Sequence, residues 1–434
     1  MKKPDRQKRN ATISNSIQER DTCHMRSLFP CQYDIGEKDD ICWPRPLRIS
    51  FSQLCSLIII FIMSLGGSSI AATRYVWTNS PSPGSGYQTW STAAHTIQEA
   101  IDAATAGDIV LVTNGLYATG GRVISGSLTN RVAIDKPVTV QSVNGPRVTI
   151  IIGESPNGNS AVRGVYLTNG AAFLAGFTIS NGHTRVEGDS RLEQSGGGVF
   201  SEGWTSEQPL SGTISNCIIT GNAACIGGGG VMGGTIYNSS VIGNQAVDGG
   251  GCIYSELYNC DLIGNIATSR GGGSYRSQLY NCFITGNSAE YGGGGNRGVF
   301  FSCTLTANSA SNSGGGIYDG ASVDTVAFNS IVYYNSAPSP WEANYDYFSS
   351  LNFCFTSPQP HGDHHNFTNE PGIVSSDNPH LIRSSLCIDT GGNDFHVRTD
   401  VDIDGDARTN QIIVDIGCDE FWASSCTGGM TVAI

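Results

Sequence analysis

Four aspartates alternate with other residues near the C-terminal end of the chain: Asp400, Asp402, Asp404 and Asp406. Oxygen ligands at this spacing are typical of calcium-binding loops. The segment differs from an EF-hand at its twelfth position, which is Gln411 rather than glutamate, and no helical pattern surrounds it. Two interpretations remain, a calcium site or a β-turn in which Arg408 pairs with a carboxylate. Calcium is therefore a possible cofactor, and no cofactor is required.

A second polar cluster combines three imidazoles with one carboxylate: His361, Asp363, His364 and His365. Neutral imidazoles and a carboxylate suit transition metals. The cluster replaces an ordinary loop between Pro358 and Asn366, however, and nothing else in that stretch requires histidine. A solvated loop is therefore the default interpretation, and a specific metal site is the alternative.

The elements that must position such groups repeat between residues 212 and 336 with a period of 21 or 22 residues, followed by one step of 27. An asparagine closes each unit, at Asn222, Asn244, Asn265, Asn287, Asn308 and Asn335. Glycine triplets follow in step, at residues 228–230, 249–251, 271–273, 293–295 and 314–316. Short strands between Asn and Gly turns at this period predict one coil of a parallel β-solenoid. Leucine-rich repeats would need a helix-like half, which the glycine triplets forbid.

Alternate residues within each unit fall on opposite faces of the predicted strand. One column reads Cys217, Ser239, Cys260, Cys282, Cys303 and Ser330, and two residues later each unit has an aliphatic residue. The position between these columns follows no rule, as expected for a strand with one buried side. Asn and Gly are expected to supply the left-handed turns. Because coils stack about 4.8 Å apart, inward Cys, Asn and aliphatic residues should form ladders.

Stacking also predicts a ligand site three residues beyond each glycine triplet. At this position successive coils have Gly233, Tyr254, Arg276, Arg297 and Asp319, provided that the alignment of the coils shifts by one residue at Gly295. Two arginines beside a tyrosine and an acid could bind a sugar chain through carboxylate contacts and ring stacking. The alternative is that these charges serve solubility on the outer face of the solenoid.

The repeats resemble those of polymorphic outer-membrane proteins, within the pectate-lyase-like superfamily. The resemblance rests on segments 249–254 and 284–287, and residues 96–104 and 107–112 are similar to the capping helix and first coils of exported β-helix proteins. Segments 385–391, 402–408 and 414–420 resemble choice-of-anchor Q domain proteins. The resemblance implies an all-β fold, a right-handed parallel β-helix with an N-terminal capping helix. It implies little about activity.

Members of this superfamily often cleave polysaccharides, so a polysaccharide lyase or a glycoside hydrolase is the alternative function. Elimination needs a base, often beside calcium, and hydrolysis needs two carboxylates at catalytic separation. The repeat places no two acids in one column, because Asp248, Glu256, Asp261 and Glu290 fall on different positions of the coil. An insertion at residues 183–210 could still complete a cleft.

The cysteines divide into groups. Four lie before residue 72, and Cys217, Cys260, Cys282 and Cys303 are expected to be packed thiols inside the ladder. The disulfide candidates lie outside the repeat, at Cys354, Cys387, Cys418 and Cys426, with Cys354 paired to Cys387 as the favoured connectivity.

Residues 51–72 are predicted to be an export signal, because the apolar stretch 54–65 is too short to span a membrane and small residues follow it. Residues 1–50 are expected to lie outside the fold, either as a leader extension or because the start codon is assigned too early. The predicted fold comprises a β-helix at 73–344, further coils and a cap at 345–421, and a tail at 422–434.

Charge limits the partners of the predicted mature chain. Residues 73–434 carry 14 basic and 30 acidic residues, a net charge of −16, and Lys136 is their one lysine. Nucleic acid is therefore excluded as a partner, since phosphate neutralisation needs basic clusters. We expect a secreted or cell-surface solenoid with an adhesive, scaffolding or carbohydrate-contacting role. Polysaccharide or cell-envelope components are its expected partners, and membranes matter only through export or surface attachment.

Overall fold

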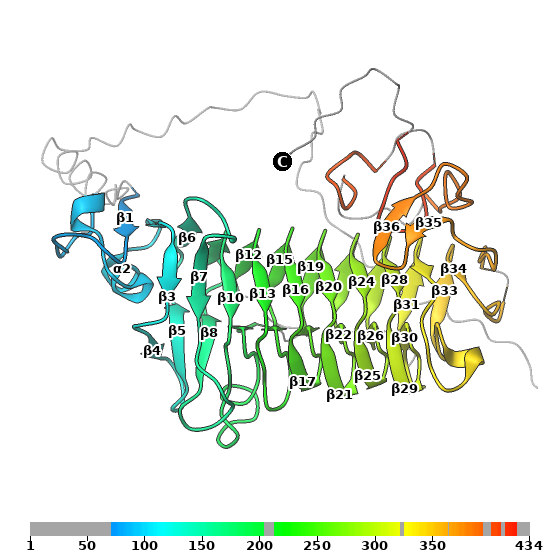
Figure 1. Cartoon of the computed structure of the whole chain (residues 1–434), viewed down its shortest axis with the longest axis horizontal. Helices are drawn as coiled ribbons and strands as arrows, with labels where there is room; N and C mark the ends of the chain where they lie inside the picture. The colour runs from blue at the N-terminus through cyan, green and yellow to red at the C-terminus, as the bar shows by residue number, and fades with distance from the viewer. Residues whose placement is uncertain are drawn as a thin grey trace, which may run out of the picture. The chain divides into compact units, whose positions relative to one another are not determined.

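The computed structural model describes residues 71–203, 212–321, 325–362, 364–393, 401–408 and 413–422. These residues form short strands, one α-helix and two 3₁₀ turns (Figure 1). The leader, most of the predicted export signal, the candidate metal ligands Asp363 and Asp400, and the disulfide candidate Cys426 lie outside the described residues. None of the described helices is long and apolar enough to cross a membrane.

Sheet A has eleven strands in the described part of the chain, one from each successive coil. They are β1 (Thr73–Val76), β2 (Ile109–Val112), β6 (Thr139–Ser142), β9 (Phe173–Ala175), β12 (Thr213–Ser215), β15 (Thr235–Tyr237), β19 (Glu256–Tyr258), β23 (Gln278–Tyr280), β27 (Val299–Phe301), β31 (Val326–Phe328) and β33 (Ser350–Asn352).

Sheet B has ten strands among the described residues. They are β3 (Gly115–Tyr117), β7 (Thr149–Ile152), β10 (Thr178–Ser180), β13 (Ile218–Thr220), β16 (Ser240–Ile242), β20 (Asp261–Ile263), β24 (Phe283–Thr285), β28 (Thr304–Thr306), β32 (Ile331–Val332) and β34 (Phe355–Thr356).

Two further sheets contribute to the coils, sheet C along most of the solenoid and sheet D in four coils. Sheet C contains β4 (Arg122–Val123), β5 (Thr129–Ile134), β8 (Val162–Leu167), β11 (Val199–Ser201), β14 (Val231–Met232), β18 (Cys252–Ile253), β22 (Ser274–Tyr275), β26 (Gly295–Asn296) and β30 (Ile317–Tyr318). Sheet D contains β17 (Gln245–Asp248), β21 (Ile266–Arg270), β25 (Ser288–Tyr291) and β29 (Ser309–Ser313).

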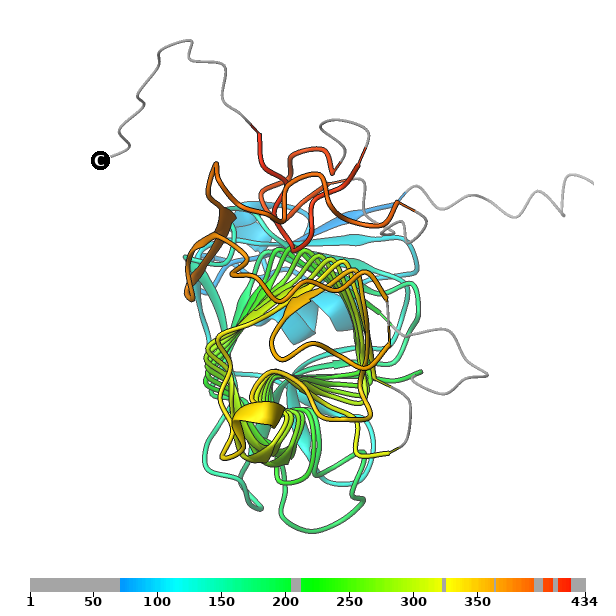
Figure 2. The ribbon, with the colours of Figure 1, turned by 90° about the vertical axis from the view of Figure 1, so that its right-hand side faces the viewer.

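In the four coils that contain sheet D, the chain passes through sheets A, B, D and C in that order and then returns to sheet A one coil further on. Equivalent strands pair in parallel and in register, as Leu257 of β19 pairs with Leu279 of β23. Figure 2 shows the coils superimposed, with the strands enclosing a common interior. The chain is a right-handed parallel β-helix, which confirms the predicted fold class.

The interior contains the predicted ladders. The aliphatic column of sheet B is fully buried from coil to coil: Ile219, Val241, Leu262, Ile284, Leu305 and Val332. The cysteine column is buried beside it and continues to Cys354 on the last coil, where the sequence repeat is no longer recognisable. The period-two prediction for these strands is therefore confirmed.

The asparagine column is a continuous chain of buried hydrogen bonds. The Oδ1 atom of Asn265 accepts both the backbone N–H and the Nδ2–H of Asn244, each at 3.0 Å. Its own Nδ2 donates to Asn287 Oδ1 at 2.9 Å and to the Val241 carbonyl at 2.8 Å. The same pattern extends from Asn222 to Asn335, where Asn344 accepts the last pair.

Glycine and asparagine make most of the left-handed turns between sheets, as expected, but the ladder asparagines are not among them. The ladder asparagines are absent from the positive-φ residues, and the residue before each usually takes that role, such as Gly264 with φ of 62°. A second left-handed position lies between sheets A and B, where Asn238 and Asn259 have φ of 47° and 51°. The ladder side chains therefore serve as inward hydrogen-bonding groups rather than as turn formers.

Both ends of the solenoid carry non-repeating structure. Helix α2 (Ile97–Ala103) begins with a capping box between Thr96 and Glu99 and buries Ile97 and Ile101 against the first coils. The 3₁₀ turns are η1 (Trp90–Thr92) and η2 (Pro340–Glu342). At the other end, β35 (Ile373–Ser375) and β36 (Asn378–Leu381) form an antiparallel pair.

The C-terminal segment lies outside the ring of strands, against sheet B (Figure 2). The Ser376 carbonyl accepts hydrogen bonds from Thr285 Oγ1 at 3.0 Å and from Thr306 Oγ1 at 2.6 Å. The Asn281 side chain donates to the Val401 carbonyl at 3.0 Å. This cover explains why outward residues of β24 and β28 are buried although their column follows no sequence rule.

The asparagine ladder predicts a large stability effect from one buried amide. We expect Asn265→Ala to lower the free energy of unfolding by about 3 kcal/mol, because two donors of Asn244 lose their buried acceptor. Denaturant unfolding followed by circular dichroism measures the change. As the matched control, Asn238→Gly alters an exposed left-handed asparagine and should change stability by less than about 0.5 kcal/mol. Equal effects of the two substitutions would contradict the assignment.

Candidate functional site

The predicted ligand column lies at the turn from sheet C to sheet A, in the expected register. Four of its members share a left-handed backbone on successive coils: Gly233 (φ 73°), Tyr254 (φ 53°), Arg276 (φ 49°) and Arg297 (φ 51°). The expected slippage at Gly295 is wrong, because the fourth triplet is 292–294. Gly292 has φ of 70° and matches the first glycine of the other triplets, while Gly295 belongs to β26.

The two arginines of this column present cationic groups one coil apart. Arg276 is exposed, and its Nη1 donates to the Tyr254 hydroxyl at 3.0 Å. Its guanidinium carbon lies 5.3 Å from the centre of the Tyr275 ring. Neither Arg276 nor Arg297 forms an ion pair with another described residue. They border a shallow hollow of about 430 Å³.

Asp319 does not belong to this surface, although the sequence places it in the same column. Its side chain is fully buried, and Oδ1 accepts the Thr325 N–H at 2.8 Å. Its backbone N–H donates to Asp346 Oδ1 at 3.0 Å rather than to a carbonyl of a following coil. The regular stacking ends here, so the acid turns inward and anchors the chain before β31.

The insertion at 183–210 completes a cleft beside Arg276, as far as its residues are described. This arginine pocket has a volume of about 380 Å³. It is lined by Ser190, Arg191, Ser195, Ile226, Gly227, Met232, Asp248, Ile253, Tyr254, Arg270, Tyr275 and Arg276. Arg270 stacks 4.9 Å from the Tyr275 ring centre and pairs with Asp248 at 2.6 Å.

A buried arginine holds the insertion against the solenoid. Arg163 donates to the carbonyls of Gly196 and Ser195, each at 2.9 Å, and to that of Leu192 at 2.6 Å. Its guanidinium lies 4.8 Å from the centre of the Phe200 ring. Complete burial lowers the pKa of Arg163 to about 9, and the charged form is compensated by these carbonyl dipoles and rings.

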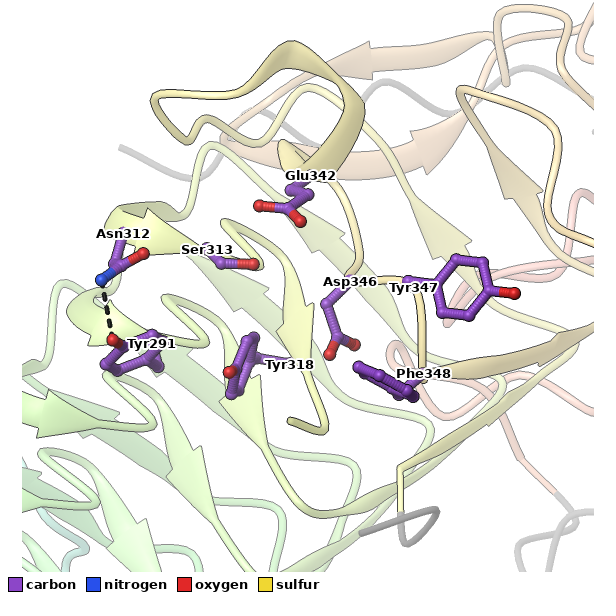
Figure 3. Close-up of a pocket in the computed structure, with 8 residues that line it drawn as sticks. All are labelled: Tyr291, Asn312, Ser313, Tyr318, Glu342, Asp346, Tyr347 and Phe348. Atoms are coloured by element: carbon purple, nitrogen blue, oxygen red, sulfur yellow. Dashed lines mark hydrogen bonds between the residues drawn. The ribbon is translucent and has the colours of Figure 1, made fainter. Parts of the chain in front are cut away.

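A second pocket, which the sequence did not reveal, lies between sheets D and C near the last coils (Figure 3). This aromatic pocket has a volume of about 310 Å³ and is lined by Tyr291, Asn312, Ser313, Tyr318, Glu342, Asp346, Tyr347 and Phe348. The Tyr291 and Tyr318 ring centres are 4.9 Å apart, and Asn312 Nδ2 donates to the Tyr291 hydroxyl at 2.7 Å. Aromatic faces thus lie beside amide, hydroxyl and carboxylate groups.

The two carboxylates of the aromatic pocket differ in their surroundings. Asp346 is buried, and it accepts backbone N–H groups from Asp319 at 3.0 Å and from Gly320 at 2.9 Å. Glu342 is half-buried in the 3₁₀ turn η2. Burial, followed by the charge of Asp346, raises the pKa of Tyr318, so this hydroxyl stays protonated and able to donate.

Exposed rings continue beyond the aromatic pocket. A neighbouring hollow of about 380 Å³ shares Glu342 and Tyr347 with it and adds Trp341, Tyr345, Pro358, Gln359 and His361. Trp341 is 74% exposed and Tyr347 is 68% exposed, which leaves their faces available to a ligand. Because segment 337–349 interrupts the repeat, sequence periodicity gave no signal for these residues.

The predicted calcium loop is a turn in the described residues. Asp402 is buried, and its Oδ1 accepts the backbone N–H groups of Asp404 at 3.0 Å and Asp406 at 2.8 Å. Arg408 donates to the Asp415 carbonyl at 2.9 Å rather than to a carboxylate. The three described aspartates therefore do not converge, and a calcium site remains a prediction.

The histidine loop does not gather its imidazoles into one site. His365 stacks on Phe353 with ring centres 4.7 Å apart, and His361 meets Tyr347 edge to face at 4.9 Å. Asp363 lies outside the described residues. The solvated-loop interpretation fits these contacts.

The structure does not form the expected pairing of Cys354 with Cys387. Both thiols are free, as is that of Cys418, and each donates to a nearby carbonyl or lies buried in packed surroundings. Cys354 belongs to the inward column, where Sγ donates to the Asn352 carbonyl at 3.2 Å. Cys387 packs in a separate apolar cluster under the C-terminal segment. Cys426 lies outside the described residues.

Comparison with known proteins yields distant structural neighbours. No protein-family model matches the sequence, and no curated protein matches it. The pectate lyase Pel9A shares 14% identity, with 82% of this chain and 97% of that chain covered and a TM-score of 0.43. A rice weevil pectin methyl esterase shares 11% identity over 74% of this chain and 96% of that chain, with a TM-score of 0.31.

An iota-carrageenase in complex with iota-carrageenan fragments is more distant still. It shares 14% identity over 58% of this chain and 57% of that chain, with a TM-score of 0.20. All three TM-scores are low, so the assignment to the class of parallel β-helix proteins rests on the sheets of this chain.

The thiol assignments predict a specific labelling pattern. Burial raises the pKa of Cys354 and Cys418 to about 12, so iodoacetamide at pH 8 should modify them at least about a hundredfold more slowly than the half-buried Cys225. Timed quenching with peptide mapping by mass spectrometry measures each rate, and labelling in guanidinium is the control. A disulfide-linked peptide containing Cys354 and Cys387 would restore the sequence-based pairing.

Proposed function

We propose that this protein is an exported β-solenoid that binds a polysaccharide along sheets C and D. The observation that carries the proposal is the aromatic pocket, in which ring faces lie beside fixed polar groups. Sugars present apolar C–H faces and a belt of hydroxyls, so rings that stack and groups that hydrogen-bond suit them together. Asp346 supports this role, because backbone amides hold its carboxylate in place.

The arginine pocket supports an extended ligand. Arg270 of β21 is paired with Tyr291 of β25 on the next coil, so residues of the two pockets occupy neighbouring strands. Tyr275 is similarly two coils from Tyr318 along sheet C. A chain that follows the stacking direction would reach both pockets and present an acidic substituent to Arg276. The overall negative charge disfavours a densely anionic polymer.

Secretion or cell-surface display belongs to the same proposal. The predicted export signal ends where the described fold begins, since Ala72 donates its N–H to Asp108 at 2.7 Å and β1 starts at Thr73. An adhesive or scaffolding role outside the cell is compatible with a rigid solenoid that carries a sugar-binding face.

The proposal predicts that the exposed ring of Tyr347 and the guanidinium of Arg276 contribute separately to glycan binding. In a glycan-array screen of the purified protein, Tyr347→Ala should weaken every bound glycan about tenfold, equivalent to about 1.4 kcal/mol of lost stacking. Arg276→Ala should weaken only glycans with a uronic acid or sulfate group, and high salt should reproduce that loss.

Matched substitutions elsewhere serve as controls. Tyr237→Ala removes a tyrosine that is 38% exposed on sheet A, and Arg383→Ala removes an exposed arginine of the C-terminal segment. Both should leave binding unchanged. No binding to any glycan, or an equal loss in Tyr237→Ala and Tyr347→Ala, would refute the proposed site.

Hydrolysis is the second candidate function, favoured by the presence of Glu342 and Asp346 in one pocket. Both carboxylate oxygens of Asp346 already accept hydrogen bonds from backbone N–H groups. This arrangement suits a residue that holds the chain in place better than a catalytic proton donor. We expect no release of reducing or unsaturated sugars from bound polysaccharides. A release that Glu342→Gln abolishes would establish a hydrolase instead.

A further inference from the structure

Three side chains from separate parts of the C-terminal segment converge at one point. His380 lies in β36, Asp404 lies in the turn within residues 401–408, and Asp419 lies in the last described segment, residues 413–422. One potential ligand atom from each lies within 4.8 Å of the other two. Up to 39 positions of sequence separate these residues, so the fold rather than a local motif assembles the group.

Groups outside the trio hold the ligand atoms in place. His380 Nδ1 contacts Asn378 Oδ1, and Nε2 faces Asp404 Oδ2 at 2.7 Å. A proton on Nδ1 donated to the Asn378 amide leaves the lone pair of Nε2 directed towards the carboxylates. Asp419 is 5% exposed, and one of its oxygens accepts the Leu381 N–H at 2.7 Å. This is the arrangement by which outer partners orient the ligands of a metal.

Negative charge accumulates around this point. The buried Asp402 lies beside the trio, with its Oδ2 accepting the N–H of Glu420, the residue after Asp419. Among the described residues His380 is the only ion-pair partner of these acids. The arrangement therefore has an excess of carboxylates that a cation would balance.

We propose that His380, Asp404 and Asp419 bind a divalent transition-metal ion, for which zinc is the best match. Zinc accepts imidazole nitrogen and carboxylate oxygen at about 2.0–2.2 Å, so its ligand atoms lie about 3.3 Å apart around a tetrahedral ion. Small side-chain shifts bring the trio to that spacing, and water fills the fourth position. Calcium is a poorer match, because it takes oxygen ligands and would leave the imidazole unused.

The ion would connect three segments of the C-terminal cover of sheet B. These are the antiparallel pair β35–β36, the turn at 402–405 and the segment 413–422. A shared metal would restrict the distance between them. Binding to the folded state alone stabilises that state. This site is independent of the proposed sugar-binding face, which lies on sheets C and D.

Calorimetric titration of the chelator-treated, dialysed protein with zinc chloride tests the site. We expect one zinc ion per chain. His380→Ala and Asp404→Asn should each weaken zinc binding at least about tenfold, and Asn378→Ala should weaken it about tenfold through loss of the imidazole orientation. His364→Ala, which removes an exposed histidine of the loop at 361–365, is the matched control and should bind zinc normally.

A thermal melt with and without zinc gives a second readout. Zinc should raise the melting temperature of the natural protein and of His364→Ala, and it should not raise that of Asp404→Asn. Asp404 is half exposed, so this substitution tests the site without disturbing a buried group. The proposal is overturned if the natural protein binds no zinc. It is equally overturned if His380→Ala and Asp404→Asn bind zinc as tightly as the control.

Discussion

The buried asparagine ladder is the interaction on which the rest of the structure depends. Each amide accepts two hydrogen bonds from one coil and donates to the next, so no coil can change its height or register without breaking bonds on both sides. Leaving a buried amide without partners destabilises the fold by more free energy than its hydrogen bonds contribute. The loss of one amide therefore also affects its neighbours in the ladder. The ladder therefore fixes the coil repeat that every column of side chains inherits.

A fixed repeat turns the glycine triplets into a steric requirement. A Cβ atom on Gly250 would lie 2.4 Å from the carbonyl oxygen of Ile266, and one on Gly251 would lie 2.4 Å from that of Gly273. Only glycine permits this approach between sheets D and C. The tight corner brings the outward residues of both sheets together. Arg270 packs on the ring of Tyr275, and Tyr291 contacts the ring of Tyr318, which lies one coil further along than Tyr291. The candidate sugar-binding face is thus a consequence of the packing inside the solenoid.

Sequence periodicity predicted the fold, the inward columns and the register of Tyr254, Arg276 and Arg297, because each depends on one repeated backbone geometry. It failed where the glycine run made the alignment ambiguous and where the coil geometry stops repeating. Four consecutive glycines concealed the true triplet at 292–294, and Asp319 turns inward because no regular coil follows it. The aromatic pocket needs Glu342 and Asp346 from an interrupting segment, and the trio at His380 needs three distant segments. Neither arrangement leaves a period or a spacing in the sequence.

Two acids of this chain are kept ionised by hydrogen bonds from backbone N–H groups and neighbouring side chains. Backbone N–H groups of Ser127 and Asp189 hold the pKa of Glu193 below its ordinary value. Asp108 is similar, since its hydrogen bonds from Thr105, Ala72 and Arg74 outweigh the effect of burial and lower its pKa. Carboxylates of this kind remain ionised and act as acceptors that tie irregular segments to the coils. Asp346 also accepts backbone N–H groups, which hold its carboxylate in one direction, and its proposed role is to orient sugar hydroxyls.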